Sequence, residues 1–205
     1  MRKSVLIPII FTTFMWFVNM IQFYTGWNLG GLGINPREKQ SLIGILTSPL
    51  IHGNWEHLMS NTLPLLILSV ILLVTYEKLS VRIWLLNYVL TGLLVWLFAR
   101  GGTYHIGASG IVYGLASFLF FSGFFRMDVK SIAIASGVAL FYGGMVWGIL
   151  PIQPGVSWES HLFGAITGLT LAFIFRNIQK EDSIKRHEEE IIKRKTFEEF
   201  LKSRN

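Results

Sequence analysis

The sequence predicts an all-α membrane protein with six transmembrane helices. Only 15% of its 205 residues are charged and 52% are hydrophobic, whereas a soluble domain carries about 25% charged residues. The charges are gathered in short stretches that separate long uncharged runs. A membrane-spanning helix needs about 20 mostly apolar residues. Six of the runs are candidates, and the last, which is short, is expected to include Trp158 or Arg176 at its ends.

The expected spans are, in chain order, residues 5–23, 57–75, 83–99, 109–125, 131–150 and 160–175. The first follows Arg2 and Lys3, as a signal peptide would. It is longer than a signal-peptide core, however, and no small-residue cleavage site closes it, so we interpret it as a retained helix. The run 40–55 is too short to cross and is broken by Pro49. We expect it to form an interfacial or membrane-dipping loop after the first span.

Two parts of the chain differ in composition. Residues 1–177 form one predicted membrane domain, and residues 178–205 form a polar tail with isoleucines at roughly helical spacing. We expect this tail to be a solvated amphipathic helix on the cytoplasmic side, with lipid or partner binding as the alternative.

The distribution of Lys and Arg predicts the orientation of the chain in the membrane. All but three of the 18 basic residues lie at the N-terminus, in the turns after the second and fourth spans, or from Arg176 onward; the exceptions are Arg37, Lys39 and Arg100. The positive-inside rule therefore places both termini in the cytoplasm. The net charge of +6 is explained by contact with anionic lipid in the bilayer, so no nucleic-acid partner is expected. The compact chain shows no organelle presequence, which favours a bacterial plasma membrane.

Ser109 is the first candidate catalytic residue, in the sequence Gly107-Ala108-Ser109-Gly110. The glycines permit a tight turn with close backbone approach. If a helix begins here, its unpaired N–H groups lie beside the hydroxyl and can stabilise an oxyanion. The alternative is that these small residues only pack helices together.

His161 is the candidate base. Gly164 and Gly168 follow at i+3 and i+7 on the same helical face, where they would allow another helix to approach closely. Contact with the glycine face of the 109–125 span would bring His161 within reach of Ser109. The alternative is a buried structural histidine.

Three further residues suit the same site. His57 and Asn61 are four residues apart, so they share a helical face and can both donate hydrogen bonds to an oxyanion. Their alternative role is to hold helices together through polar contacts. Tyr113, four residues after Ser109, is placed to stack on the imidazole or to be an ordinary lipid-facing aromatic residue.

The sequence offers no acid to orient the base. Asp128 and Asp182 are the only aspartates, and both lie on the predicted cytoplasmic side, away from His161. Glu56 and Glu159 lie at the correct end but are expected to face water. We therefore expect a Ser–His dyad, and an aspartyl protease is disfavoured. The chain has no cysteine and no His-Glu-x-x-His, so neither a metal site nor a cofactor is expected.

Together these residues resemble the rhomboid family of intramembrane serine proteases over the six-span core. Gly107-Ala108-Ser109-Gly110 is similar to the family's nucleophile motif, and His161-x-x-Gly164-x-x-x-Gly168 is similar to its base motif. His57-x-x-x-Asn61 is similar to the oxyanion motif. By the same resemblance, His52 is a structural histidine and Tyr113 packs on the base. Two departures are the absence of Trp-Arg in the first loop and Ser160 in place of the usual alanine.

The resemblance implies a serine endopeptidase that cleaves single-span membrane-protein substrates near the non-cytoplasmic end of their helix. The fifth span would act as a lateral gate. Two other classes remain open. One is a catalytically silent rhomboid-like protein that binds membrane helices. The other is a transporter or metal-binding protein that uses the clustered histidines.

Overall fold

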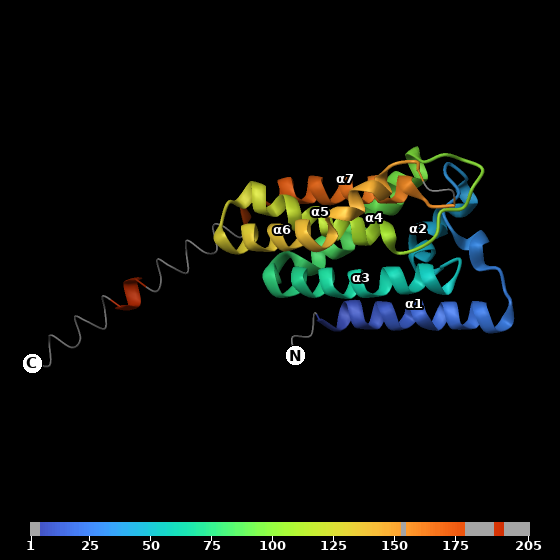
Figure 1. The fold of residues 1–205 in the computed structure, drawn as a ribbon, viewed down its shortest axis with the longest axis horizontal. Coiled ribbons are helices and arrows are strands. Elements are labelled where there is room, and N and C mark those ends of the chain that lie inside the picture. The colour runs from blue at the N-terminus through green and yellow to red at the C-terminus, as the bar shows by residue number, and fades with distance from the viewer. Residues whose placement is uncertain (1–4, 153–154, 179–190, 195–205) are drawn as a thin grey trace, which may run out of the picture.

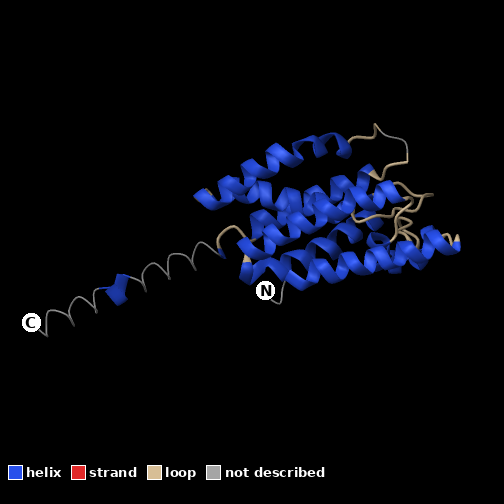
Figure 2. Cartoon of the chain, turned by 60° about the horizontal axis from the view of Figure 1, so that its bottom comes forward, coloured by secondary structure: helices blue, strands red, loops and turns tan. Residues whose placement is uncertain are grey.

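The computed structural model describes residues 5–152, 155–178 and 191–194, and within these ranges the chain is helical with no β-strand (Figure 2). The long helices are α1 (Leu6–Thr25), α3 (Trp55–Thr75), α4 (Glu77–Phe98), α5 (Ser109–Arg126), α6 (Val129–Tyr142) and α7 (Trp158–Ile174). The short elements are η2 (Leu29–Leu32), η3 (Lys39–Ile43), α2 (Gly44–Thr47), η4 (Ser48–Leu50) and η5 (Gly143–Ile149).

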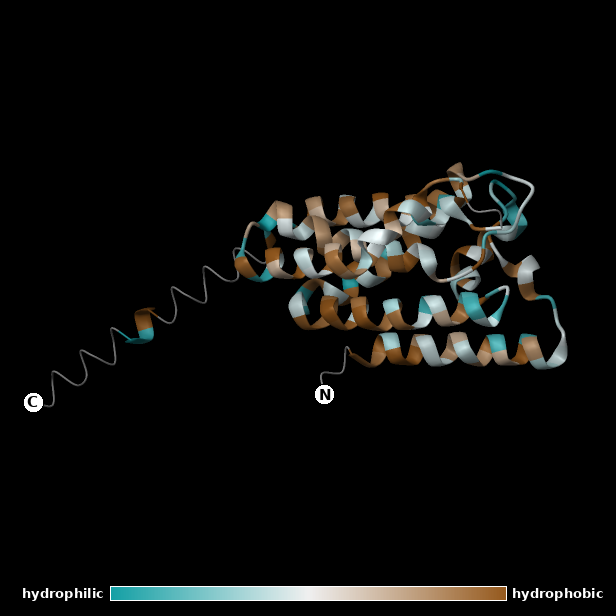
Figure 3. Ribbon diagram, in the orientation of Figure 1, coloured by the Kyte–Doolittle hydropathy of each residue, from teal (hydrophilic) through white to brown (hydrophobic). Residues whose placement is uncertain are grey.

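The long helices form an antiparallel bundle (Figure 1). Helices α3, α5 and α7 begin at the same end of the bundle, where α1 and α4 finish. We call this the Ser109 end. Apolar residues line the helices, and many polar ones lie in the loops of the Ser109 end (Figure 3). This distribution is typical of a bundle whose flanks face lipid.

Five helical segments are long and apolar enough to cross a membrane: α1, α3, α4, α5 and the stretch Val129–Ile149, which combines α6 and η5. The prediction of an all-helical, multi-pass protein is confirmed to that extent. Helix α7 has 17 residues, at the lower limit of the roughly 17–25 residues that span a bilayer. A crossing by α7 therefore stays a prediction.

Two predicted spans differ from the helices observed. Helix α4 begins at Glu77 rather than at residue 83, because its first turns carry charges that the search for uncharged runs excluded. The predicted span 131–150 is an α-helix only to Tyr142 and continues as the 3-10 helix η5. Gly143 and Gly144 stand at this change, in keeping with the low helix propensity of glycine.

Helix α5 occupies the centre of the bundle. It contacts α3, α4, α6 and α7, and 13 of its 18 residues are buried, whereas only Ser131, Ala135 and Val138 are buried in the α6–η5 stretch. Its side chains Ile111, Leu115, Phe118 and Leu119 pack into the main apolar core. The central helix is thus the one that begins at Ser109, whereas α6 lies at the periphery and is held by few buried side chains.

The predicted interfacial segment 40–55 forms short helices, η3, α2 and η4, before α3 begins. Asn54 caps α3, because its Oδ1 accepts a hydrogen bond from the His57 N–H at 2.8 Å. Of the predicted tail, residues 178 and 191–194 lie within the described part of the chain, and they are helical. The tail helix, its cytoplasmic position and the boundary at residue 178 stay predictions.

Candidate active site

Ser109 is the first residue of α5. The turn before it depends on Gly107, whose φ of +103° is one that a side chain would disfavour. Its N–H donates to the Ser48 carbonyl at 2.9 Å, which fixes the turn against η4. Because Ser109 and Gly110 lie in the first turn, the helix supplies no carbonyl to their amide N–H groups. The structure thus puts a buried hydroxyl beside backbone donors.

His161 is the fourth residue of α7, which packs closely on α5. The glycines predicted to permit this approach lie in register. A Cβ on Gly164 would overlap the Gly110 carbonyl oxygen, and a Cβ on Gly168 would overlap that of Gly114. The two helices therefore touch backbone to backbone, a spacing that small residues allow.

Ser109 and His161 are hydrogen-bonded, with 2.8 Å between Oγ and Nε2. The other ring nitrogen, Nδ1, lies 2.8 Å from the Gly148 carbonyl oxygen. A carbonyl can only accept, so Nδ1 carries the proton of the neutral imidazole and Nε2 presents its lone pair to the serine. The Ser109 hydroxyl then donates to Nε2. This is the arrangement in which a histidine removes a proton from a nucleophile.

Tyr113 holds the imidazole from one side. Its ring is parallel to that of His161, with 4.1 Å between centroids and an interplanar angle of 6°. The Tyr113 hydroxyl donates to the Met145 carbonyl at 2.8 Å. Because Met145 and Gly148 both belong to η5, this element fixes both the base and the residue stacked on it.

The group that orients the base was not found from the sequence. The orienting acceptor is the Gly148 backbone carbonyl, and no residue type signals a carbonyl that points at a distant side chain. Asp128 caps α6 at the opposite end of the bundle. Asp182 lies outside the described residues. Within the described part of the chain, a backbone carbonyl therefore orients the histidine of the dyad, the role that an aspartate has in a Ser-His-Asp triad.

The two predicted oxyanion residues lie at the start of α3. The His57 ring lies against Gly107, since a Cβ on that glycine would be 2.6 Å from Nε2. Asn61 is buried, and its side-chain amide donates to the His57 carbonyl at 2.9 Å. His57 thus lies beside the turn that carries the serine, while Asn61 is bonded within its own helix.

His52 supports the same turn from behind. Its Nε2 accepts a hydrogen bond from the Ala108 N–H at 3.4 Å, and its ring meets that of His57 edge-on at 4.8 Å. Burial, together with neighbouring His57, lowers the pKa of His52 to about 3, although the Leu50 carbonyl acts in the opposite direction. His52 is therefore a neutral acceptor at neutral pH.

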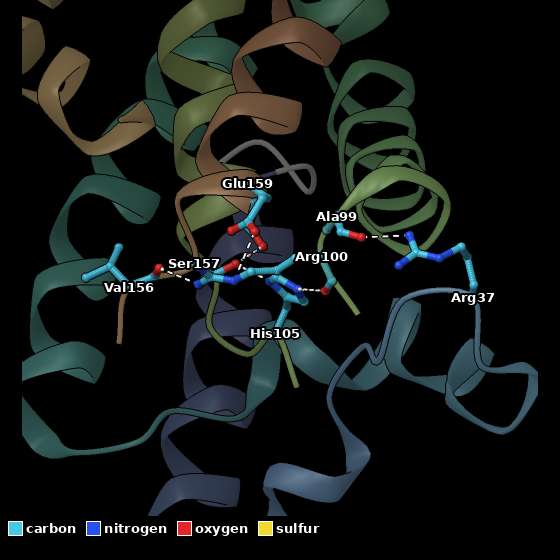
Figure 4. A network of polar contacts seen from close by, with 8 residues as sticks. Arg37, Ala99, Arg100, His105, Val156, Ser157 and Glu159 are labelled. Atoms are coloured by element: carbon cyan, nitrogen blue, oxygen red, sulfur yellow. Dashed lines mark hydrogen bonds and ion pairs between the residues drawn. The ribbon is translucent and has the colours of Figure 1, made fainter. Parts of the chain in front are cut away.

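The expectation that Glu159 faces water was wrong, whereas Glu56 is exposed as expected. Glu159 is 3% exposed, and its Oε1 lies 3.1 Å from Nε of Arg100 (Figure 4). A partner 59 positions away cannot be identified from local sequence. This ion pair partly offsets the cost of burying the carboxylate, whose two oxygens make no hydrogen bond.

His105, the fourth histidine of the Ser109 end, joins the same network (Figure 4). Its Nε2 lies 3.3 Å from the Arg100 carbonyl oxygen, and its Nδ1 lies 2.5 Å from Ser157 Oγ. Burial lowers the pKa of His105, and the Arg100 charge lowers it further, against the opposite effects of the Arg100 carbonyl and Glu159. Among the described residues, no cluster of three or more His, Cys, Asp or Glu side chains is arranged to hold a metal ion.

Comparison with known proteins extends this description. A family model described as "Rhomboid domain" matches residues 39–178. Uncharacterised proteins of Mycobacterium bovis and Mycobacterium leprae are 37% and 35% identical over 174 residues, which is 80% of this chain and 72% and 68% of theirs. A protein of Acanthamoeba polyphaga mimivirus that is named as a rhomboid protein is 25% identical over 140 residues, 65% of this chain and 75% of its own. The predicted resemblance to the rhomboid family is thereby confirmed, and the chain belongs to that family.

Proposed function

We propose that this rhomboid is an intramembrane serine protease that hydrolyses peptide bonds in or near the transmembrane helices of single-span membrane proteins. The observation that carries the proposal is the hydrogen bond of 2.8 Å between Ser109 Oγ and His161 Nε2. The tautomer fixed by Gly148 makes Nε2 the proton acceptor. By the resemblance to the rhomboid family, an inactive relative would lack the serine or the histidine, whereas this chain keeps both.

The reaction follows from the dyad. Ser109 Oγ attacks the scissile carbonyl carbon while its proton passes to Nε2 of His161. The tetrahedral oxyanion is stabilised by the Ser109 N–H and by donors from His57 and Asn61, once Asn61 releases the His57 carbonyl. His161 then gives the proton to the leaving amine. Water, activated by the same imidazole, releases the acyl chain and restores Ser109.

The substrate would enter from the lipid between α3 and α6. An apolar groove of about 840 Å³ lies there, lined by residues such as Leu63, Ile67 and Val74 of α3 and Ile134 and Phe141 of α6. Only Ser131, Ala135 and Val138 of α6 are buried, so displacing α6 while η5 stays against His161 and Tyr113 exposes little core. Helix α7 would be the sixth span, in a bacterial plasma membrane. Both termini would be cytoplasmic, as the distribution of Lys and Arg predicts.

Substrate entry between α3 and α6 can be tested separately from the chemistry of the Ser109–His161 dyad. A flexible bis-maleimide would join cysteines introduced at Ile67 and Ile134, in a chain that has no cysteine of its own. We expect cleavage of a membrane-protein substrate to be lost, whereas a small aqueous probe still labels Ser109. Unchanged cleavage by the cross-linked protein would contradict lateral entry at this groove.

The protease activity is tested with a fluorophosphonate probe, which reacts with an activated serine. We expect labelling of the purified protein in detergent and in liposomes, and its loss in Ser109→Ala and His161→Ala. Ser117→Ala is the matched control, because Ser117 lies on the same helix, is equally buried and donates to the Ala165 carbonyl at 2.7 Å. It should be labelled like the wild type.

The alternative is a catalytically silent rhomboid that binds membrane helices. If the folded wild type is not labelled in either environment, the protease proposal is refuted and this alternative is favoured. Labelling that persists in Ser109→Ala would show that another serine reacts, and would equally refute the assigned nucleophile.

A further inference from the structure

We propose that Glu159, held by Arg100, is a positioning residue that fixes the first turn of α7 and thereby holds His161 at the correct distance from Ser109. This role rests on the proposed protease function. It concerns a buried ion pair that lies outside the dyad and the oxyanion residues.

The burial of Glu159 is unusual for its position. Glu159 and Glu56 both occupy the second residue of a helix, in α7 and α3, and each follows a tryptophan. A carboxylate there interacts favourably with the helix dipole even when it is exposed, as Glu56 is. Glu159 is 3% exposed instead, and burying a charge is unfavourable unless it is paired. The dipole alone therefore does not explain its burial.

Arg100 connects Glu159 to the segment that leads into the nucleophile. It lies in the loop between α4 and α5, and its side chain is 54% exposed. Its Nε reaches Glu159 at 3.1 Å, and its carbonyl oxygen lies 3.3 Å from Nε2 of His105. One residue thus holds both the start of α7 and the loop that ends at Ser109.

A second connection runs parallel to the first (Figure 4). Since the Arg100 carbonyl can only accept, Nε2 of His105 carries the proton and Nδ1 accepts from Ser157 Oγ at 2.5 Å. Ser157 Oγ also lies 2.6 Å from Ser160 Oγ, immediately before His161 in the chain. The loop that precedes Ser109 and the turn that precedes His161 are therefore fastened together at two points.

The dyad needs this support because no acid holds its base. Within the described residues, the His161 ring is oriented by one carbonyl and one stacked tyrosine, both dependent on the peripheral element η5. The position of the α7 backbone must be fixed by other contacts. A misplacement of about 1 Å costs on the order of 100-fold in rate, so loosening the first turn of α7 should slow catalysis.

The test is Glu159→Gln, with Glu56→Gln as the matched control. Glutamine keeps the shape of Glu159 and removes its charge, while Arg100 is half exposed and can be hydrated. Because neither carboxylate oxygen of Glu159 makes a hydrogen bond, the substitution removes the ion pair without breaking a hydrogen bond. We expect Glu159→Gln to lower the rate of fluorophosphonate labelling per folded molecule at least about tenfold. With a membrane-protein substrate, kcat should fall while KM changes little. Glu56→Gln loses the same dipole interaction but no ion pair, and should label within about twofold of the wild type.

A purely structural role predicts a different result: a lower melting temperature with an unchanged rate per folded molecule. Arg100 supplies a second test that does not depend on how Glu159→Gln folds. Arg100→Lys keeps the positive charge at a half-exposed position, and should retain most of the rate that Arg100→Gln loses. Equal rates in these two variants would contradict a role for the ion pair.

The outcomes separate this role from the proposed function. If the wild type is labelled at Ser109 and Glu159→Gln is labelled equally fast, the positioning role is refuted and the protease proposal stands. If the wild type is not labelled at all, both are refuted.

Discussion

The contact of α5 with α7 through paired glycines makes Gly164→Ala the sharpest test of the site geometry. A Cβ at this position would overlap the Gly110 carbonyl oxygen, and would lie 3.0 Å from the Gly110 carbonyl carbon and 3.2 Å from its Cα. All three are backbone atoms, so no side-chain rotation relieves the clash. Carbon and oxygen in contact normally lie about 3.3–3.6 Å apart, so α7 must move away from α5 by about 1 Å.

That displacement acts directly on the dyad. The hydrogen bond between Ser109 and His161 measures 2.8 Å, and an added separation of about 1 Å removes it from hydrogen-bonding range. A misplacement of about 1 Å is associated with a rate loss of about 100-fold. The protein should remain folded, because two effects on the free energy of unfolding oppose each other. Overpacking costs about 1–3 kcal/mol, whereas replacing glycine by alanine in a helix stabilises it by about 1 kcal/mol.

The assay is the rate of fluorophosphonate labelling per folded molecule, with the melting temperature measured on the same samples. We expect Gly164→Ala to label about 100-fold more slowly while remaining folded. Gly31→Ala is the control, because a Cβ there meets nothing within 4 Å, and it should label like the wild type. If folded Gly164→Ala labels within about threefold of the wild type, the reasoning that close helix contact sets the dyad distance is refuted.

Three further predictions follow from the same structure. Tyr113→Phe keeps the stacking on His161 but loses the hydrogen bond to Met145, and should slow labelling about 3–10-fold because such a bond is worth about 1 kcal/mol. Tyr113→Leu also loses the stacking and should be labelled more slowly still. Equal labelling rates in the two variants would contradict a role for stacking. Because the pKa of His52 is lowered, the unfolded chain binds a proton that the folded protein excludes, so the free energy of unfolding is highest above about pH 6.5 and falls as the pH decreases towards 3. Between pH 7 and pH 5 the free energy of unfolding should fall by about 2 kcal/mol, measured as a fall in melting temperature that is smaller in His52→Gln. An identical fall in both proteins would contradict this role of His52. Single cysteines at exposed Tyr104 and Val129 test the orientation in intact bacterial cells: a membrane-impermeant maleimide should label the first directly and the second only after permeabilisation, and the reverse pattern would overturn the assignment.

Much of the fold follows from local composition. A run of about 20 apolar residues has few alternatives to a helix in lipid, since every backbone group must be satisfied within the segment. Counting such runs therefore located the long helices. Their ends were less well predicted, as α4 shows: its charged first turn extends beyond the apolar run, and charge alone does not end a helix. Within α6–η5, hydropathy could not distinguish an α-helix from a 3-10 helix.

The residues of the candidate site were also indicated by the sequence, because their chemistry resides in side chains. Ser109 and His161 stand beside glycines whose spacing already suggested that two helices touch. The structure brings these two residues together and stacks Tyr113 on the imidazole. Their catalytic roles stay predictions until labelling is measured.

Only the tertiary structure decided how the base is oriented and what surrounds it. The Gly148 carbonyl that sets the tautomer of His161 belongs to the backbone, which is the same at every position of the sequence. Glu159 is buried and paired with Arg100 from a distant loop, and Asn61 bonds to its own helix. The sequence by itself determined which chemical groups and which apolar segments the protein has. Their pairing depended on where the folded chain brings distant atoms within a hydrogen bond of one another.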